Sequence, residues 1–88
     1  MKVEFSKKFY KDVDAIEPTH IRQSLIRLIE SLEAAENLEA IGNLKRLKGH
    51  KSAYRIRIND YRLGFFFENA TILLARFVHR KDIYKMFP

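Results

Sequence analysis

The sequence predicts an α+β domain, in which a small, mainly antiparallel sheet of about four strands carries two N-terminal helices packed on one face. Three observations support this. Apolar residues recur at helical spacing between residues 7 and 36. Between residues 54 and 78 they alternate with polar residues or form short runs, as in strands. Residues 2–5 add a short strand at the start. The predicted order is therefore strand, two helices and three strands, in a single domain spanning residues 1–88.

The first half of the chain contains clear helix signals. Ser6 is a plausible N-cap for a helix over residues 7–15. Phe5 and Tyr10 have the spacing of a hydrophobic staple across that cap. Pro18 suits the first turn of a second helix, which should end near residues 36–37. The apolar stripe that this second helix should bury consists of Ile21, Leu25, Leu28, Ile29 and Leu32.

Residues 38–52 are predicted to form a connector, because Gly42 and Gly49 interrupt any regular pattern. The segment is rich in basic residues, and two interpretations are open. They can belong to a solvated loop, or they can form a rim that holds a polyanion, since phosphate contacts need charge more than exact geometry. The residues concerned are Lys45, Arg46, Lys48 and Lys51.

The second half predicts a hairpin and a third strand. Residues 54–58 alternate apolar and basic, the Asn59-Asp60 pair favours a tight turn, and residues 61–68 alternate again. A second tight turn at residues 68–70 leads into a strand over residues 71–78. The apolar runs in these last two strands indicate central positions in the sheet.

A two-residue hairpin loop fixes which side chains lie opposite each other. It places Ile58 opposite Tyr61, Arg57 opposite Arg62, Ile56 opposite Leu63 and Arg55 opposite Gly64. One face is then apolar and the other carries three arginines. Like charges at opposing positions destabilise a sheet, so fold stability does not require this cluster. It is either a solvated face or an anion site, and the planar guanidinium is well suited to phosphate.

Charge is distributed unevenly along the chain. Residues 1–43 contain six basic and eight acidic side chains, whereas residues 44–88 contain eleven basic and three acidic ones. A positive field of this kind attracts nucleic acid, an acidic protein or an anionic membrane. No strongly basic amphipathic helix is present, so a membrane is not expected as a partner. The absence of cysteine, of a signal segment and of a transmembrane run leads us to expect a cytoplasmic protein.

Groups able to carry chemistry are few. There is no serine–histidine–acid arrangement, no glycine-rich phosphate loop and no metal-ligand spacing. What remains is the segment HRKDIY, whose His79, Arg80 and Tyr84 should converge with the arginine face. Arginine can neutralise phosphate charge, and histidine or tyrosine can move a proton. The alternatives are a surface histidine for His79 and an anchoring aromatic for Tyr84. For Arg76 we expect a structural role.

The segments LKRLKG, YRIRINDYRLGF and HRKDIY together resemble the RelE/ParE superfamily of bacterial and archaeal toxins, and the resemblance spans the whole chain. It implies the toxin of a type II toxin–antitoxin pair. RelE-like members cut messenger RNA in the ribosomal A site, where the RNA's own 2′-hydroxyl attacks the adjacent phosphate, and they require no metal or other cofactor. The implied partners are the ribosome, messenger RNA and a RelB-like antitoxin from an adjacent gene, in a hetero-oligomer with the toxin.

The resemblance also suggests roles for individual residues. Arg55 and Arg57 match the basic pair on the first hairpin strand, and Arg62 matches the arginine that binds the scissile phosphate. Arg80 matches the basic residue near the leaving oxygen. Tyr84 matches the C-terminal tyrosine that stacks on or activates the substrate. The predicted catalytic set is Arg57, Arg62, His79, Arg80 and Tyr84. The predicted RNA-binding set is Lys45, Arg46, Lys48, Lys51, Arg55 and Lys81.

Two other functions remain open at this stage, because a shared fold does not determine function. One is a ParE-like inhibitor of DNA gyrase, which binds its target without cleaving nucleic acid. The other is a non-catalytic RNA- or ribosome-binding domain, whose binding would be sensitive to salt.

Overall fold

A computed structural model describes all 88 residues. The chain begins with strand β1 (Lys2–Phe5) and helices α1 (Lys7–Asp14) and α2 (Thr19–Ala34). A 3₁₀ turn (Leu38–Ala40) and strands β2 (Leu44–Arg46), β3 (Ala53–Ile58), β4 (Tyr61–Glu68) and β5 (Thr71–His79) follow, and helix α3 (Ile83–Met86) closes the chain. The predicted α+β class is confirmed.

The strands form one sheet in the order β1-β5-β4-β3-β2. β1 runs parallel to β5, and every other pair is antiparallel. The sheet has five strands where about four were predicted, because β2 lies inside the segment that we predicted to be a connector. Three residues are too few to produce a recognisable alternation. The predicted central positions of β4 and β5 are confirmed.

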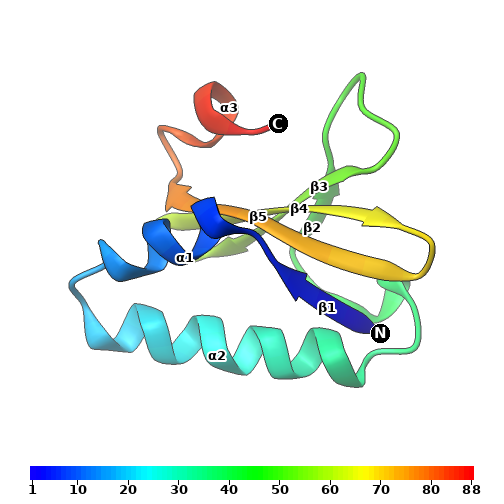
Figure 1. Cartoon of the computed structure of the whole chain (residues 1–88), viewed down its shortest axis with the longest axis horizontal. Helices are drawn as coiled ribbons and strands as arrows, with labels where there is room; N and C mark the ends of the chain where they lie inside the picture. Colours follow the sequence, from blue (N-terminus) through cyan, green and yellow to red (C-terminus); the bar gives the residue numbers. More distant parts are fainter.

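Helices α1 and α2 lie on one face of the sheet, and the short α3 lies on the other (Figure 1). The main core fills the space between the sheet and the two long helices, with Leu32, Leu63 and Phe65 wholly buried. A smaller cluster attaches α3 to the opposite face. It consists of Leu47, Ala53, Ile83 and Phe87. The second cluster matters for function, because it fixes α3 beside the hairpin.

The predicted signals at the start of α1 are confirmed. The backbone N–H of Phe9 donates to Ser6 Oγ at 3.1 Å, and the rings of Phe5 and Tyr10 stack with centroids 5.7 Å apart. The second helix ends at Ala34, slightly before the predicted residues 36–37. Asn37 instead caps the following 3₁₀ turn by accepting a hydrogen bond from Ala40 N.

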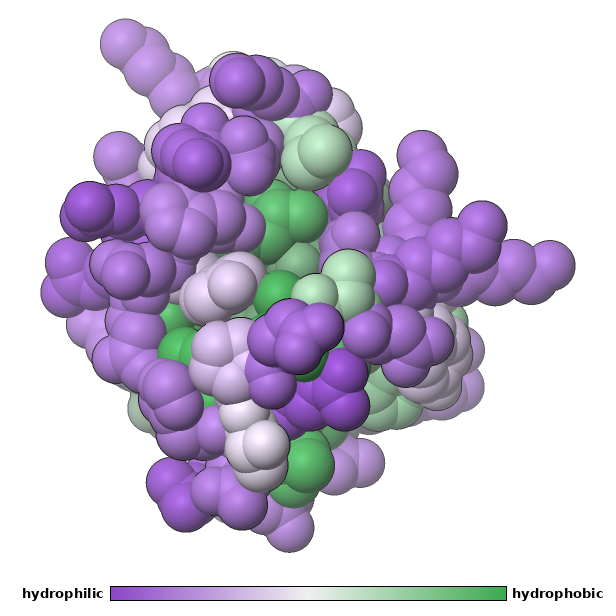
Figure 2. All heavy atoms as spheres, turned by 90° about the vertical axis from the view of Figure 1, so that its left-hand side faces the viewer, coloured by the Kyte–Doolittle hydropathy of each residue, from purple (hydrophilic) through white to green (hydrophobic).

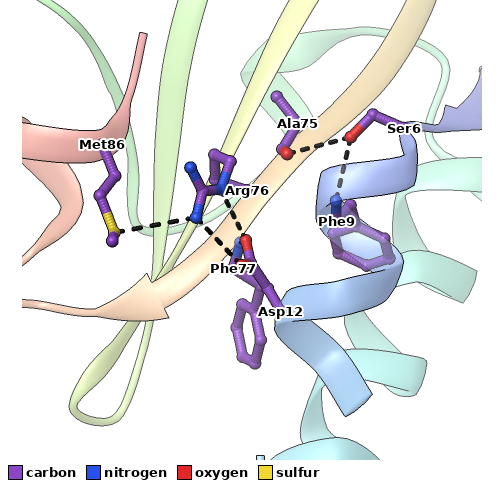
Figure 3. A network of polar contacts seen from close by, with 7 residues as sticks. All are labelled: Ser6, Phe9, Asp12, Ala75, Arg76, Phe77 and Met86. Carbon is purple, nitrogen blue, oxygen red and sulfur yellow. Dashed lines mark hydrogen bonds and ion pairs between the residues drawn. The ribbon is translucent and has the colours of Figure 1, made fainter. Parts of the chain in front are cut away.

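Arg76 is structural, as predicted. Its Nε and Nη2 donate to the two carboxylate oxygens of Asp12 at 2.8 and 3.0 Å (Figure 3). The same carboxylate accepts the backbone N–H of Phe77 at 2.9 Å. Asp12 thereby joins α1 to β5 through three hydrogen bonds. The side-chain hydrogen bond from Arg76 to Asp12 also raises the pKa of the guanidinium.

The hairpin has the predicted register. Ile58 pairs with Tyr61, Arg57 with Arg62, Ile56 with Leu63 and Arg55 with Gly64. Asn59 adopts a φ of 52°, the left-handed conformation that a two-residue hairpin loop requires. The second turn uses Asn69 and Ala70, with φ of 52° and 57°. A register shift in the β4–β5 pairing at Gly64/Phe65 leaves Ala75 of β5 without a partner residue in β4.

Candidate functional site

Four cationic side chains from three neighbouring strands share the face on which α3 lies. The register sets Lys45 of β2 beside Arg55 of β3, and Arg57 of β3 beside Arg62 of β4. The ion pairs of the molecule involve other cations, so none of these four has a carboxylate within 4.0 Å. The face therefore presents uncompensated positive charge, which an external anion would neutralise.

Arg62 occupies the centre of this cluster. Its Nη1 donates to the backbone carbonyls of Asn59 and Tyr61, each at 2.9 Å, so the side chain is held against the hairpin turn. Burial lowers the pKa of Arg62, and the charges of Arg55, Arg57 and Arg80 lower it further. The positive charges of these four guanidinium groups therefore repel one another. Binding a phosphate here would relieve their repulsion.

Tyr84 reaches the cluster from α3. Arg55 Nε donates to the Tyr84 hydroxyl at 3.4 Å. This hydrogen bond lowers the pKa of the Tyr84 hydroxyl against the opposing effect of burial, and the charges of Arg55, Lys45 and Arg62 add to the decrease. The predicted convergence of the arginines with Tyr84 is thus confirmed as geometry. The roles of these residues in RNA binding and catalysis stay predictions.

A hollow of about 880 Å³ opens at the end of the sheet, where the hairpin turn meets the start of α2. Figure 2 views this end of the molecule, and hydrophilic residues surround a smaller hydrophobic area. Arg57, Arg62 and Arg80 line the hollow. Arg80 is fixed to the turn, because its backbone N–H donates to Asp60 O at 2.7 Å and its Nε lies 3.8 Å from the Asp60 carboxylate.

His79 lines the same hollow but does not lie on the arginine face. Its register partner is Tyr61, whose ring packs in the main core, and the two ring centroids are 5.7 Å apart in an edge-on arrangement. Its Nδ1 accepts the backbone N–H of Lys81 at 3.2 Å. His79 therefore forms the rim of the hollow on the helix side, opposite Arg57 and Arg62.

The remaining predicted RNA-binding residues are spread over two faces. Lys48 lies near Lys45 and Tyr84 and lines a smaller hollow with them. Arg46 pairs with Tyr54 and so points to the helix-covered face, away from the cluster. Lys51 and Lys81 are exposed in loops. The structure thus brings Lys45, Lys48 and Arg55 towards Tyr84 and leaves Arg46 apart.

Two residues that fix the site were not identified from the sequence. A Cβ on Gly64 would lie 2.7 Å from Phe87 Cδ2, so the ring of Phe87 occupies the space that a side chain there would need. This contact holds α3, and hence Tyr84, against the sheet. An isolated glycine within a strand pattern is the signal that could have revealed it.

Nowhere do three histidine, aspartate or glutamate side chains gather as the ligands of a metal ion would. None of the helices combines the length and the apolar character needed to cross a membrane.

The chain matches a family model and is similar to proteins of known family. The family model described as the RelE-like toxin of the type II toxin–antitoxin system HigB matches residues 1–79. Toxin RelE3 of Methanocaldococcus jannaschii is 39% identical over 89 aligned positions that cover all of both chains. The match to RelE3 includes the positions of Arg80 and Tyr84, which the family model does not reach.

Solved structures agree. A chain of the RelB–RelE antitoxin–toxin complex from Methanococcus jannaschii superposes with a TM-score of 0.82 at 36% identity, covering 97% of this chain and 99% of that one. A chain of the archaeal RelE–RelB complex from Pyrococcus horikoshii OT3 gives a TM-score of 0.72 at 19% identity, with 93% and 97% coverage. The second match shows the shared fold alone.

Proposed function

This chain belongs to the RelE-like toxins of type II toxin–antitoxin systems, and from that premise we propose that it is a ribosome-dependent endoribonuclease that cleaves translated messenger RNA. One observation carries the proposal. Arg55, Arg57 and Arg62 share one face without internal counter-ions, and Arg80 lines the same hollow as Arg57 and Arg62. Arg55 also donates to the hydroxyl of Tyr84, whose pKa is lowered. A phosphodiester is the anion that best fits such a group of guanidiniums.

The proposed reaction is an attack within the RNA chain. The 2′-hydroxyl of one nucleotide attacks the adjacent phosphorus, the bond to the 5′-oxygen breaks, and the products end in a 2′,3′-cyclic phosphate and a 5′-hydroxyl. Arg62 and Arg57 neutralise the charge that develops on the non-bridging oxygens, which is the interaction that accelerates phosphoryl transfer. Arg62 is held by two backbone carbonyls, so its guanidinium is already positioned before substrate binds.

Proton transfer is assigned to Tyr84 and solvent. A lowered pKa increases the fraction of Tyr84 that is ionised and able to accept the 2′-hydroxyl proton at a given pH. Arg80 stabilises the departing 5′-oxygen, which takes a proton from water in the open hollow at the end of the sheet. Arginine itself stays protonated throughout, because its pKa is far above neutrality.

The proposed partners are the ribosome and an antitoxin. Its cations lie on an exposed surface that cannot by itself align a flexible RNA, so we assign alignment of the codon to the ribosome in the cytoplasm. The related archaeal RelE chains were solved in complexes with RelB antitoxins. We therefore assign to this toxin a cognate RelB-like antitoxin, encoded by the adjacent gene, that forms a hetero-oligomer with it.

The test is cleavage of a message in a reconstituted translation system, read by primer extension. The native protein should cut the translated message, and Arg62→Ala and Arg80→Ala should each reduce the rate by about 10²-fold or more, as for loss of one charge-stabilising donor. Arg27→Ala, which removes an exposed arginine of α2, should leave the rate unchanged. An intact message in the presence of folded native protein would reject the nuclease. Supercoiling by purified gyrase should proceed normally, and its inhibition would favour the ParE-like alternative.

A further inference from the structure

A second hollow lies beyond Tyr84, between the β2–β3 loop and α3. Its volume is about 240 Å³. Lys45, Lys48 and His50 line one side, Tyr84, Phe87 and Pro88 line the other, and no acidic side chain takes part. The hollow therefore combines two ammonium groups and an imidazole with the partly exposed ring of a tyrosine.

The loop that forms this hollow is fixed in place. Leu47 is 5% exposed and packs in the same cluster as Ile83 and Phe87, so the loop is attached to α3 by apolar contacts. The backbone N–H of Leu47 donates to Ala53 O at 2.8 Å, and that of His50 donates to Leu47 O at 3.1 Å. The loop turns between Lys48 and His50 at Gly49, whose φ of 82° suits glycine. The hollow is therefore part of the folded structure.

The hollow is continuous with the arginine face. Lys45 also lines a third hollow of about 300 Å³, together with Arg55 and Arg57. Arg57 in turn lines the large hollow at the end of the sheet, where Arg62 and Arg80 lie. Each hollow thus shares one basic residue with the next, and together they form one cationic path from the hairpin turn to the β2–β3 loop. Such a path matches an extended chain of phosphates better than a single anion.

We propose that the hollow between the β2–β3 loop and α3 binds the RNA phosphate next to the one that is cleaved, an inference that rests on the proposed nuclease function. Lys48 and Lys45 neutralise this second phosphate, and His50 donates a hydrogen bond to it. Tyr84, which is 62% exposed, lines this hollow and contacts Arg55, so its ring is placed to stack on the base between the two phosphates. His50 and the hollow thereby become part of the substrate site.

The experiment uses 2′-O-methyl oligonucleotides, which lack the attacking hydroxyl and so report binding alone. A dinucleotide carrying one phosphate and a trinucleotide carrying two are titrated into the full chain, with amide NMR shifts and affinities recorded at several salt concentrations. The dinucleotide should shift the amides of residues 55–62 and Arg80. The trinucleotide should bind more tightly and also shift those of residues 48–50.

Variants then localise the second phosphate. Lys48→Ala should weaken trinucleotide binding about three- to tenfold, as for one partly exposed charge-assisted contact. It should reduce the slope of log affinity against log salt by about 0.7, the value for one phosphate of a single strand. Dinucleotide binding should not change. Arg27→Ala, which removes a positive charge from an exposed position of α2, should change neither ligand's affinity.

Two results would overturn this proposal. If Lys48→Ala weakened the binding of both oligonucleotides equally, the lysine would act only through the long-range positive potential of the surface. Binding of hexaglutamate at residues 48–50 as tightly as the trinucleotide would mean that the hollow serves an acidic protein segment. Because the ligands cannot be cleaved, the nuclease proposal is judged separately, from the translated message. A bound second phosphate with an intact message would reject catalysis while leaving this site established.

Discussion

Gly64→Ala tests whether the contact between the sheet and α3 positions the site. The added Cβ would lie 2.7 Å from Phe87 Cδ2, 2.8 Å from Cγ and 3.0 Å from Cε2. The ring cannot readily move away, because Phe87 is 3% exposed and its ring also packs 5.0 Å from that of Phe66. The substitution must therefore displace α3, which carries Tyr84, or strain the sheet.

The size of the effect follows from these contacts. Overpacking a well-packed site costs about 1–3 kcal/mol of the free energy of unfolding. Complete release of α3 would expose Ile83 and Phe87, each worth about 1.5–3 kcal/mol of burial, so displacement is the less costly response. Tyr84 would then move relative to Arg55, and a misplacement near 1 Å can lower a catalytic rate about 10²-fold. We expect a rate loss of about 10- to 100-fold.

Urea unfolding and cleavage of a translated message measure the two effects separately. Gly42→Ala is the matched control, because nothing lies within 4 Å of its Cβ position and its φ is not positive. It should be neutral or raise stability by up to about 1 kcal/mol. In a Phe87→Ala background, Gly64→Ala should lose most of its cost, since the clashing ring is gone. The reasoning fails if Gly64→Ala behaves like Gly42→Ala, or if its cost persists in that background.

Three further predictions concern charges. Arg55→Ala should raise the pKa of Tyr84, measured as the difference in phenolate absorbance between this variant and its Tyr84→Phe derivative. Because the pKa of Tyr84 is lowered in the folded state, the linked stabilisation is present above the unfolded pKa near 10 and disappears as pH falls through the lower folded pKa. The variant should therefore lose stability only at alkaline pH. Arg57→Gln should raise the free energy of unfolding by about 0.2–1 kcal/mol at low salt, by removing repulsion from the arginine opposite, and the gain should shrink as salt is added; an unchanged or lower midpoint in urea would contradict it. Asp12→Ala should lower the free energy of unfolding in urea by about 2–4 kcal/mol. It leaves the Arg76 side chain, which is 17% exposed, without its partner and also removes the acceptor of the Phe77 N–H. A loss below about 1 kcal/mol would show that water replaces the carboxylate.

The sequence was most informative where structure is local. The Asn59-Asp60 pair fixed the loop length, and the loop length fixed every cross-strand pair of the hairpin. The arginine face was therefore predictable residue by residue. The cap at Ser6 and its staple were predictable for the same reason, since each depends on residues a few positions apart.

Features that depend on contacts between distant residues were not predictable. Strand β2 exists because three residues find a partner edge on β3, and their own pattern is too short to indicate it. Composition alone groups Arg46 with Lys45, but adjacent strand residues point to opposite faces. The sequence position of His79, at the end of the last strand, predicts that it lies with the arginines, whereas its pairing with Tyr61 turns it to the helix side. Composition identified the cations, but the sheet assigned each of them to a face.

On the proposed function, the distribution of carboxylates would let RNA and an antitoxin compete for the same arginines. Asp12 neutralises Arg76 in the fold, and Asp60 lies near Arg80, but Arg55, Arg57 and Arg62 have no internal counter-ion. Their mutual repulsion is a cost that the folded chain carries until an anion arrives. On the proposed function, RNA phosphates and the carboxylates of an acidic antitoxin segment would each relieve this repulsion. Relief of the repulsion would add to the binding affinity of either ligand. On the proposed function, occupation by one would exclude the other, and inhibition would require no change in the fold of the toxin.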